Sequence, residues 1–249
     1  MRPHPSKKKS FWEKLDPFTY VDQFVMPVVN PWNNEYLSWA IYIIFSFLFA
    51  FALYSIFGFI LQTSSPLVIV VSGSMLPTLA RGDVVILHGV DGPNLSVQEV
   101  MLDDVDVKNT SLKDLADMEF QNDGNWKITF KQTGQTVYVP KQGSSDIIVY
   151  TSTYKNLEII HRAVVKIRSN GEYFVLTKGD NNPSLDQDCG TVTNFLFPGE
   201  NAPQLSTSKS CPSPYPIFLS DVKGKALVWV PWVGYVKLVL VDGLQSVFR

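Results

Sequence analysis

The sequence contains little cysteine and little histidine. Its 249 residues include two cysteines, Cys189 and Cys211, and three histidines. Two cysteines are too few for a disulfide-dense scaffold or for a zinc module built on cysteine. Three histidines leave few candidates for any role that needs an imidazole. Nothing in the residues requires a metal or a cofactor, and neither is expected.

The chain also lacks a strong net charge. Its 21 basic and 23 acidic residues give a formal net charge of -2. Proteins that bind nucleic acid normally present a basic surface that neutralises phosphates, so no nucleic acid partner is expected. The length is sufficient for one sizeable core, or for a core with a small subdomain. The sequence shows no internal repeat and no low-complexity tract.

One long stretch has no charged residue at all, from Tyr36 to Ala80. Its first part, residues 36–62, is dense in Phe, Ile, Leu, Ala and Tyr. A helix rises ~1.5 Å per residue, so this part can cross a hydrocarbon core of roughly 30 Å. A buried core helix would be shorter and would carry a polar stripe. A cleavable leader would be shorter and would end in small residues. The segment therefore predicts a permanent transmembrane anchor.

The basic residues near the anchor indicate its orientation. Five of them precede it and none follows it until Arg81; they are Arg2, Lys7, Lys8, Lys9 and Lys14. By the positive-inside rule the N-terminus is cytosolic and the chain after the anchor is outside. We therefore expect a single-pass protein of the cell membrane. Residues 1–35 form a cytosolic or interfacial segment, and residues 63–249 form an extracytoplasmic domain.

Beyond the anchor the sequence changes to short runs rich in Val, Ile, Tyr, Phe and Thr. Such runs are typical of β-strands. Asn170 and Gly171 stand between two of them, which strongly favours a two-residue hairpin turn. The extracytoplasmic part is therefore expected to be mainly β, with an inserted subdomain at about residues 91–150.

The apolar segment at residues 226–241 is open to two interpretations. It is short for a membrane span, carries Lys237 and is interrupted by Pro231 and Gly234. A strand and turn at the membrane surface is favoured, because its tryptophans suit the interfacial region. A second transmembrane helix is the alternative.

Two serines follow the anchor closely, Ser72 and Ser74, on either side of a glycine. A serine becomes a nucleophile only with a base and a group that polarises the substrate carbonyl. Without these partners, a Ser-Gly-Ser sequence is usually a turn.

Several residues could supply the base. His161 lies in a run that alternates polar and apolar residues like a half-buried strand, and a neutral imidazole accepts a proton well near neutral pH. His88 also ends a strand near the serines and is the main rival. Lys166 and Lys178 are further candidates, since a lysine with a depressed pKa can activate a serine.

A polar loop near residue 180 carries three aspartates, Asp180, Asp186 and Asp188. It is a turn by composition, and its spacing does not match a calcium-binding EF-hand loop. A solvated loop is the simplest interpretation. The alternative is that one aspartate accepts a hydrogen bond from the histidine and fixes its tautomer.

Taken together, four boxes in order resemble type I signal peptidases. They are a nucleophile box, the strand after it, a Gly-Asp-Asn box and a closing strand, here at residues 72–78, 81–85, 178–182 and 224–231. The common bacterial enzymes of this family have a lysine base where this chain has His161. The chain therefore resembles the archaeal and endoplasmic-reticulum type, which uses Ser, His and Asp.

The resemblance assigns roles to individual residues. It implies that Ser74 is the nucleophile and His161 the general base. Asp186 is favoured as the partner of the histidine, with Asp180 as a supporting second carboxylate. The oxyanion hole would consist of the Ser72 hydroxyl and the Ser74 backbone N–H.

The same resemblance implies a fold and an activity. The fold is an antiparallel β domain of the signal-peptidase type, with an apolar surface that dips into the bilayer. The activity is that of a membrane-bound serine endopeptidase that removes signal peptides from translocated preproteins by cleaving after small residues. Its partners would be signal peptides, the lipid bilayer and, as a further candidate, the translocation machinery. An oxidising exterior also permits a disulfide between Cys189 and Cys211, although their spacing does not establish it.

Two alternatives stay open at this point. One is a membrane-tethered serine peptidase that processes another class of precursor. The other is a membrane-anchored β domain that binds a partner and has no enzymatic activity.

Overall fold

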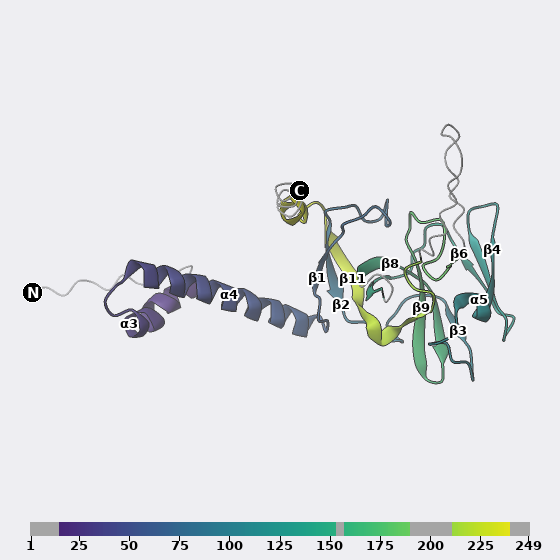
Figure 1. The fold of residues 1–249 in the computed structure, drawn as a ribbon, viewed down its shortest axis with the longest axis horizontal. Coiled ribbons are helices and arrows are strands. Elements are labelled where there is room, and N and C mark those ends of the chain that lie inside the picture. Colours follow the sequence, from purple (N-terminus) through teal and green to yellow (C-terminus); the bar gives the residue numbers. More distant parts are fainter. Residues whose placement is uncertain (1–14, 153–156, 190–210, 240–249) are drawn as a thin grey trace, which may run out of the picture. The chain divides into compact units, whose positions relative to one another are not determined.

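The computed structural model describes residues 15–152, 157–189 and 211–239 (Figure 1). The chain divides into two compact units, Met1–Phe57 and Gly58–Arg249. The basic residues on which the orientation prediction rests, from Arg2 to Lys14, lie outside the described residues.

The first unit is helical. Three short segments precede one long helix: α2 (Pro17–Tyr20), the π-helical η1 (Val21–Val25), α3 (Met26–Val29) and the long α4 (Glu35–Ile60). The ring of Phe18 contacts the rings of Tyr42 and Phe45, which holds the short segments against α4.

Helix α4 carries the uncharged apolar sequence singled out above. It has 26 residues, its most apolar 18-residue window has a mean hydropathy of 2.4, and none of its residues is buried. Most of its apolar side chains are exposed, as expected of a surface that faces lipid. Within the described part of the chain, α4 is the one helix that is long and apolar enough to cross a membrane.

The second unit is built around an eight-stranded sheet, with neighbours in the order β1-β2-β11-β7-β8-β9-β10 and with β3 paired to β8. All pairs are antiparallel except β3 with β8. The strands are β1 (Leu67–Ile69), β2 (Val84–His88), β3 (Glu99–Met101), β7 (Ile147–Thr151), β8 (Glu158–Ser169), β9 (Glu172–Lys178), β10 (Ile217–Phe218) and β11 (Val222–Val230), with the 3-10 turn η2 (Leu219–Asp221) between the last two.

Strands β8 and β9 form a long hairpin. Ser169 pairs with Glu172, and the two residues between them have positive φ angles, 50° at Asn170 and 81° at Gly171. This is the backbone of a tight hairpin turn whose twist matches that of the strands. The turn predicted from the sequence is therefore confirmed.

Within the expected insertion at about 91–150, residues 112–139 form a second, three-stranded antiparallel sheet of β4 (Ala116–Phe120), β5 (Trp126–Phe130) and β6 (Thr136–Val139), preceded by the short helix α5 (Leu112–Leu115), whereas β3 and β7 near its two ends belong to the eight-stranded sheet. The three-stranded sheet shares one hydrophobic core with β8 and β9. Ile128 and Phe130 of the small sheet are buried in the same cluster as Val165 and Leu176 of the hairpin. The mainly β fold with an N-terminal apolar helix is thus confirmed (Figure 1).

The segment after β1, which carries Ser72 and Ser74, is held on the sheet by buried apolar side chains. Met75 and Leu79 are completely buried, in a cluster with Val85 and Leu87 of β2 and Val149 of β7. Two buried anchors four residues apart fix the serine-containing turn on the sheet.

The C-terminal apolar segment has the expected strand and turn. Strand β11 ends at Val230, a turn covers residues 231–234, and residues 235–239 are helical. Several of its side chains are exposed, including Trp229 and Trp232. Residues 240 and 241 of this segment lie outside the described residues.

Candidate active site

The turn after β1 brings Ser74 to His161, 87 residues later in the chain. The Ser74 Oγ and the Nε2 of His161 lie 2.9 Å apart. Ser74 is partly exposed, whereas His161 on β8 is buried. An alcohol at the surface of a cleft thus has an imidazole behind it, which is the geometry that proton transfer from the alcohol requires.

The other ring nitrogen of His161 meets a carboxylate. Nδ1 lies 2.5 Å from Oδ2 of Asp186. Asp186 follows β9 and is buried, and its backbone N–H donates to the carbonyl of Thr177 at 2.9 Å. A carboxylate on Nδ1 keeps the proton on that nitrogen and leaves Nε2 free to accept one from the serine.

Asp186 has two more hydrogen-bond donors. Its Oδ2 accepts from the hydroxyl of Thr177 at 2.7 Å and from that of Tyr150 at 2.9 Å. Burial, and then the negative charge of Asp186, raise the pKa of the Tyr150 hydroxyl far above its ordinary value. Tyr150 therefore stays protonated and remains a donor.

Strand register explains why these groups meet. His161 pairs with Ile148 on β7, two residues from Tyr150, while Ala163 pairs with Thr177 on β9. Directly paired residues, and residues two apart on a strand, project to the same side of a sheet. The side chains of Tyr150, His161 and Thr177 consequently share one side, and Asp186 is placed over them.

The second carboxylate lies elsewhere. Asp180 accepts two hydrogen bonds from Arg162, from Nε to Oδ1 and from Nη2 to Oδ2, both at 2.7 Å. It also accepts from the hydroxyl of Thr78 at 2.5 Å. Arg162 is adjacent to His161 and therefore projects to the opposite side of β8. Each of the two neighbouring residues thus has its own aspartate.

The loop that carries Asp180 also contacts the backbone of the serine turn. The Asn181 N–H donates to the carbonyl of Ser74 at 2.8 Å, and its side-chain amide donates to the carbonyl of Gly73 at 3.2 Å. A Cβ at Gly179 would lie 2.7 Å from the Ser74 carbonyl oxygen, closer than real Cβ contacts allow. The glycine is therefore required for this close approach of the two loops.

The rival bases have other partners. Nδ1 of His88 lies 2.7 Å from the Gly89 carbonyl, and no hydrogen bond within the described residues joins His88 to Ser74. The ammonium of Lys166 pairs with Glu99 at 2.9 Å.

Lys178 is also occupied. Its ammonium donates to the carbonyls of Lys141 and Gly179 at 3.0 and 3.1 Å. Burial lowers the pKa of Lys178, although the carboxylates of Asp180 and Asp186 oppose this effect. Its bonds connect the insertion to the loop that carries Asp180.

Ser74 and His161 line a cleft with a volume of about 400 Å³. Its walls are mostly apolar and come from the strand before Ser72, from β7 and from the start of β8. The lining residues are Val68, Ile69, Val71, Ser72, Ser74, Val149, Leu157, Glu158, Ile159, Ile160, His161, Asn182 and Pro212. Ser72 is exposed, and its Oγ lies 3.2 Å from that of Ser74.

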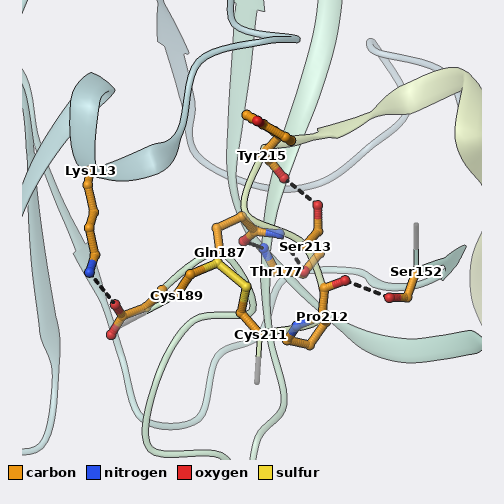
Figure 2. The surroundings of a disulfide bond; sticks show 10 residues. Lys113, Ser152, Thr177, Gln187, Cys189, Cys211, Pro212, Ser213 and Tyr215 are labelled. Atoms are coloured by element: carbon orange, nitrogen blue, oxygen red, sulfur yellow. Dashed lines mark hydrogen bonds and ion pairs between the residues drawn. A yellow bond between two sulfur atoms is a disulfide. The ribbon is translucent and has the colours of Figure 1, made fainter. Parts of the chain in front are cut away.

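A disulfide supports one side of this region. Cys189 and Cys211 are bonded, with their Cα atoms 5.0 Å apart (Figure 2). The bond fixes Pro212, whose carbonyl accepts from the hydroxyl of Ser152 at 2.5 Å and whose side chain lines the cleft. It also fixes Ser213, whose N–H donates to the Asp186 carbonyl at 3.3 Å.

No group of three or more His, Cys, Asp or Glu side chains suited to a metal ion occurs in the described ranges.

Sequence reasoning alone missed Tyr150, Thr177 and Thr78. Tyr150 and Thr177, whose hydroxyls donate to Asp186, lie on strands that the sequence predicts, but their convergence depends on the register between three strands. Thr78 belongs to the nucleophile box, and its position six residues after Ser72 gives no indication that it contacts Asp180.

The hydrogen-bonded series of serine, histidine and buried aspartate has the geometry of the site used by serine hydrolases. Comparison with known proteins narrows this class. The chain is 24% identical over 192 residues to the signal peptidase complex catalytic subunit of Colletotrichum graminicola, covering 77% of this chain and 73% of that protein. It is 26% identical over 191 residues to the same subunit of Neurospora crassa, with 77% and 73% coverage.

A third relative, the corresponding subunit of Schizosaccharomyces pombe, is 29% identical over 129 residues, 52% of each chain. No protein-family model matches the chain. The resemblance to signal peptidases of the endoplasmic-reticulum type, which the four boxes indicate, is confirmed by these similarities.

Proposed function

We propose that the chain is a membrane-bound serine endopeptidase that removes signal peptides from translocated preproteins by cleaving after small residues. The observation that carries the proposal is the continuous series Ser74–His161–Asp186, with its serine end open to an apolar cleft. The names of the similar proteins support the substrate class, since each is called a catalytic subunit of a signal peptidase complex.

In the first step Ser74 Oγ attacks the carbonyl carbon of the scissile bond, and its proton moves to Nε2 of His161. Negative charge develops on the substrate oxygen. The Ser72 hydroxyl and the Ser74 N–H are the donors that we assign to this oxyanion. His161 then gives its proton to the leaving nitrogen as the C–N bond breaks, which releases the mature protein and leaves an acyl-enzyme.

In the second step a water molecule attacks the ester carbon, and His161 accepts a proton from this water. Collapse of the second tetrahedral species returns that proton to Ser74 Oγ. The signal peptide leaves with a new carboxyl end. Asp186 stabilises the imidazolium that exists in both steps.

The roles of the two aspartates differ in this mechanism. Asp186 acts on His161 directly. Asp180 acts at a distance from the reacting atoms, because it binds Arg162 and Thr78 and so supports the turn that carries Ser74.

The cleft is compatible with the proposed substrate. Its walls include the apolar side chains of Val68, Val149 and Ile160, which suit uncharged residues before the cut better than charged ones.

We assign α4 to the bilayer, with the N-terminus in the cytosol and the catalytic domain outside the cell membrane. An anchor keeps the site at the surface where signal peptides emerge, which raises the effective substrate concentration without tight binding. Because the relatives are named as subunits of a complex, we include further subunits and the translocation machinery among the proposed partners.

The test is cleavage of a preprotein by the full chain in lipid vesicles. Ser74→Ala should lower the rate by on the order of 10⁴- to 10⁶-fold while the protein still folds and inserts. Ser111→Ala serves as the matched control. Because Ser111 is not part of the cleft lining, this variant should cleave the preprotein at the normal rate. A Ser74→Ala protein with wild-type cleavage contradicts the proposal. Normal cleavage by His161→Ala, together with an inactive His88→Ala, transfers the base to His88.

Substrate variants test the remaining alternatives. Replacing the small residue before the cut by phenylalanine should abolish cleavage without changing the rest of the preprotein. If the preprotein is bound but never cut, the chain is a binding protein. If only another precursor class is cut, the signal peptide assignment is wrong.

A further inference from the structure

The carboxylate of Asp186 receives an unusual concentration of donors on one oxygen. Its Oδ2 accepts from Nδ1 of His161 at 2.5 Å, from the Thr177 hydroxyl at 2.7 Å and from the Tyr150 hydroxyl at 2.9 Å. The three donors come from three adjacent strands, β8, β9 and β7. A carboxylate held in this way cannot rotate without losing hydrogen bonds on several sides.

Neither hydroxyl can touch a substrate. Tyr150 and Thr177 are both completely buried, and neither lines the cleft. Their hydrogen bonds to Asp186 are the route by which they can influence Ser74, since His161 stands between Asp186 and the serine. Any contribution to the reaction must therefore pass through the carboxylate.

The hydroxyls also affect the charge that Asp186 presents to His161. A carboxylate that accepts from additional donors is stabilised as an anion, and its negative charge is shared among them. Because Tyr150 stays protonated, it remains one of these donors across the range in which an imidazole titrates. Lys178 on β9 also interacts with Asp186, at longer range.

We propose that Tyr150 and Thr177 are positioning residues that keep the Asp186 carboxylate directed at Nδ1 of His161 during the reaction. This inference rests on the proposed function, because it concerns the same series of groups. It adds two residues that do not belong to the four sequence boxes.

The experiment compares variants of the full chain in lipid vesicles, with a synthetic preprotein as substrate. Tyr150→Phe and Thr177→Val each remove one hydroxyl and keep the shape of the side chain. Each should lower kcat by about 10-fold, equivalent to about 1.4 kcal/mol in the barrier, and leave KM unchanged. Thr177→Ser keeps a hydroxyl and should restore most of the rate.

A matched control removes a hydroxyl elsewhere. Thr129 of β5 lies 3.2 Å from Thr136 in the three-stranded sheet, hydroxyl to hydroxyl, and has no contact with Asp186. Thr129→Val should therefore cleave at the wild-type rate. Thermal unfolding of each variant shows whether the amount of folded protein has changed.

Two readouts separate positioning from a general structural role. In an Asp186→Asn background, Tyr150→Phe should change kcat by less than about 2-fold, since the carboxylate through which it acts is gone. In the unmodified background, Thr177→Ser should recover most of the rate that Thr177→Val loses, because it restores the hydroxyl that donates to Asp186.

The inference is overturned if Tyr150→Phe and Thr177→Val both retain wild-type kcat, or if their losses persist unchanged in the Asp186→Asn background. A failure of the proposed function has a different signature, because either the unmodified chain would not cleave the preprotein or Ser74→Ala would still cleave it. Inactive Ser74→Ala together with fully active Tyr150→Phe rejects the positioning role alone.

Discussion

Removal of the Asp180 carboxylate should destabilise the catalytic domain strongly. The side chains of Asp180 and Arg162 are 2% and 8% exposed, and two hydrogen bonds of 2.7 Å join them. In Asp180→Ala the guanidinium remains buried without its counter-charge, and the hydroxyl of Thr78 loses its acceptor. Breaking a buried ion pair by removing one partner costs about 3–5 kcal/mol.

This free energy corresponds to a large shift in Tm. For a domain of this size each kcal/mol lowers Tm by about 2–4 °C, so we expect a decrease of roughly 6–20 °C. Thermal unfolding of the full chain, followed by near-ultraviolet circular dichroism in detergent, measures it. Asp186→Asn is the comparison variant. It should lower kcat strongly, whereas its Tm should fall less than that of Asp180→Ala.

A second substitution tests the cause. In Asp180→Ala combined with Arg162→Met, no unpaired charge is left in the interior, and replacing a buried ion pair by apolar residues is often neutral. The double variant should regain at least half of the lost Tm. If Asp180→Ala melts with the wild-type protein, or if Arg162→Met makes the loss larger, the pair does not stabilise the fold in the way argued.

Two further predictions concern the supports of the serine turn and the cleft. Gly179→Ala should lower kcat by roughly 100-fold, because its Cβ, 2.7 Å from the Ser74 carbonyl oxygen, must displace the turn. Gly134→Ala is the control: its φ of 67° strains the alanine backbone, but nothing lies within 4 Å of its Cβ and the residue does not line the cleft, so the variant should cleave normally in the same preprotein assay. Replacing Cys189 and Cys211 by serine opens a loop with a sequence separation of 22 and should cost about 3 kcal/mol of stability, and a reductant should lower the Tm of the wild-type protein but not that of the double variant.

The parts of the site that could be predicted from the sequence are those determined by local features. The long uncharged apolar run predicts helix α4, and Asn170 with Gly171 predicts the β8–β9 turn. The serine box and the Gly-Asp-Asn box are recognisable because close contact between two backbones demands small residues at fixed positions, as Gly179 demonstrates.

The parts that could not be predicted depend on strand register. Tyr150 and Thr177 meet on Asp186 only because β7, β8 and β9 pair in one particular alignment. Residue types in each strand would be equally compatible with an alignment shifted by two. Only the register of β8 with β9 and of β8 with β7 determines which hydroxyls reach the carboxylate.

The same register accounts for the choice between the two aspartates. His161 and Arg162 are consecutive on β8, so their side chains project to opposite sides, and each reaches a different carboxylate from the loop after β9. A shift of β8 by one residue would exchange the two sides and place the guanidinium beside Ser74. The buried pair of Arg162 with Asp180 opposes that shift, since it would have to be broken. Asp180 thus helps to determine which of the two neighbours faces the serine.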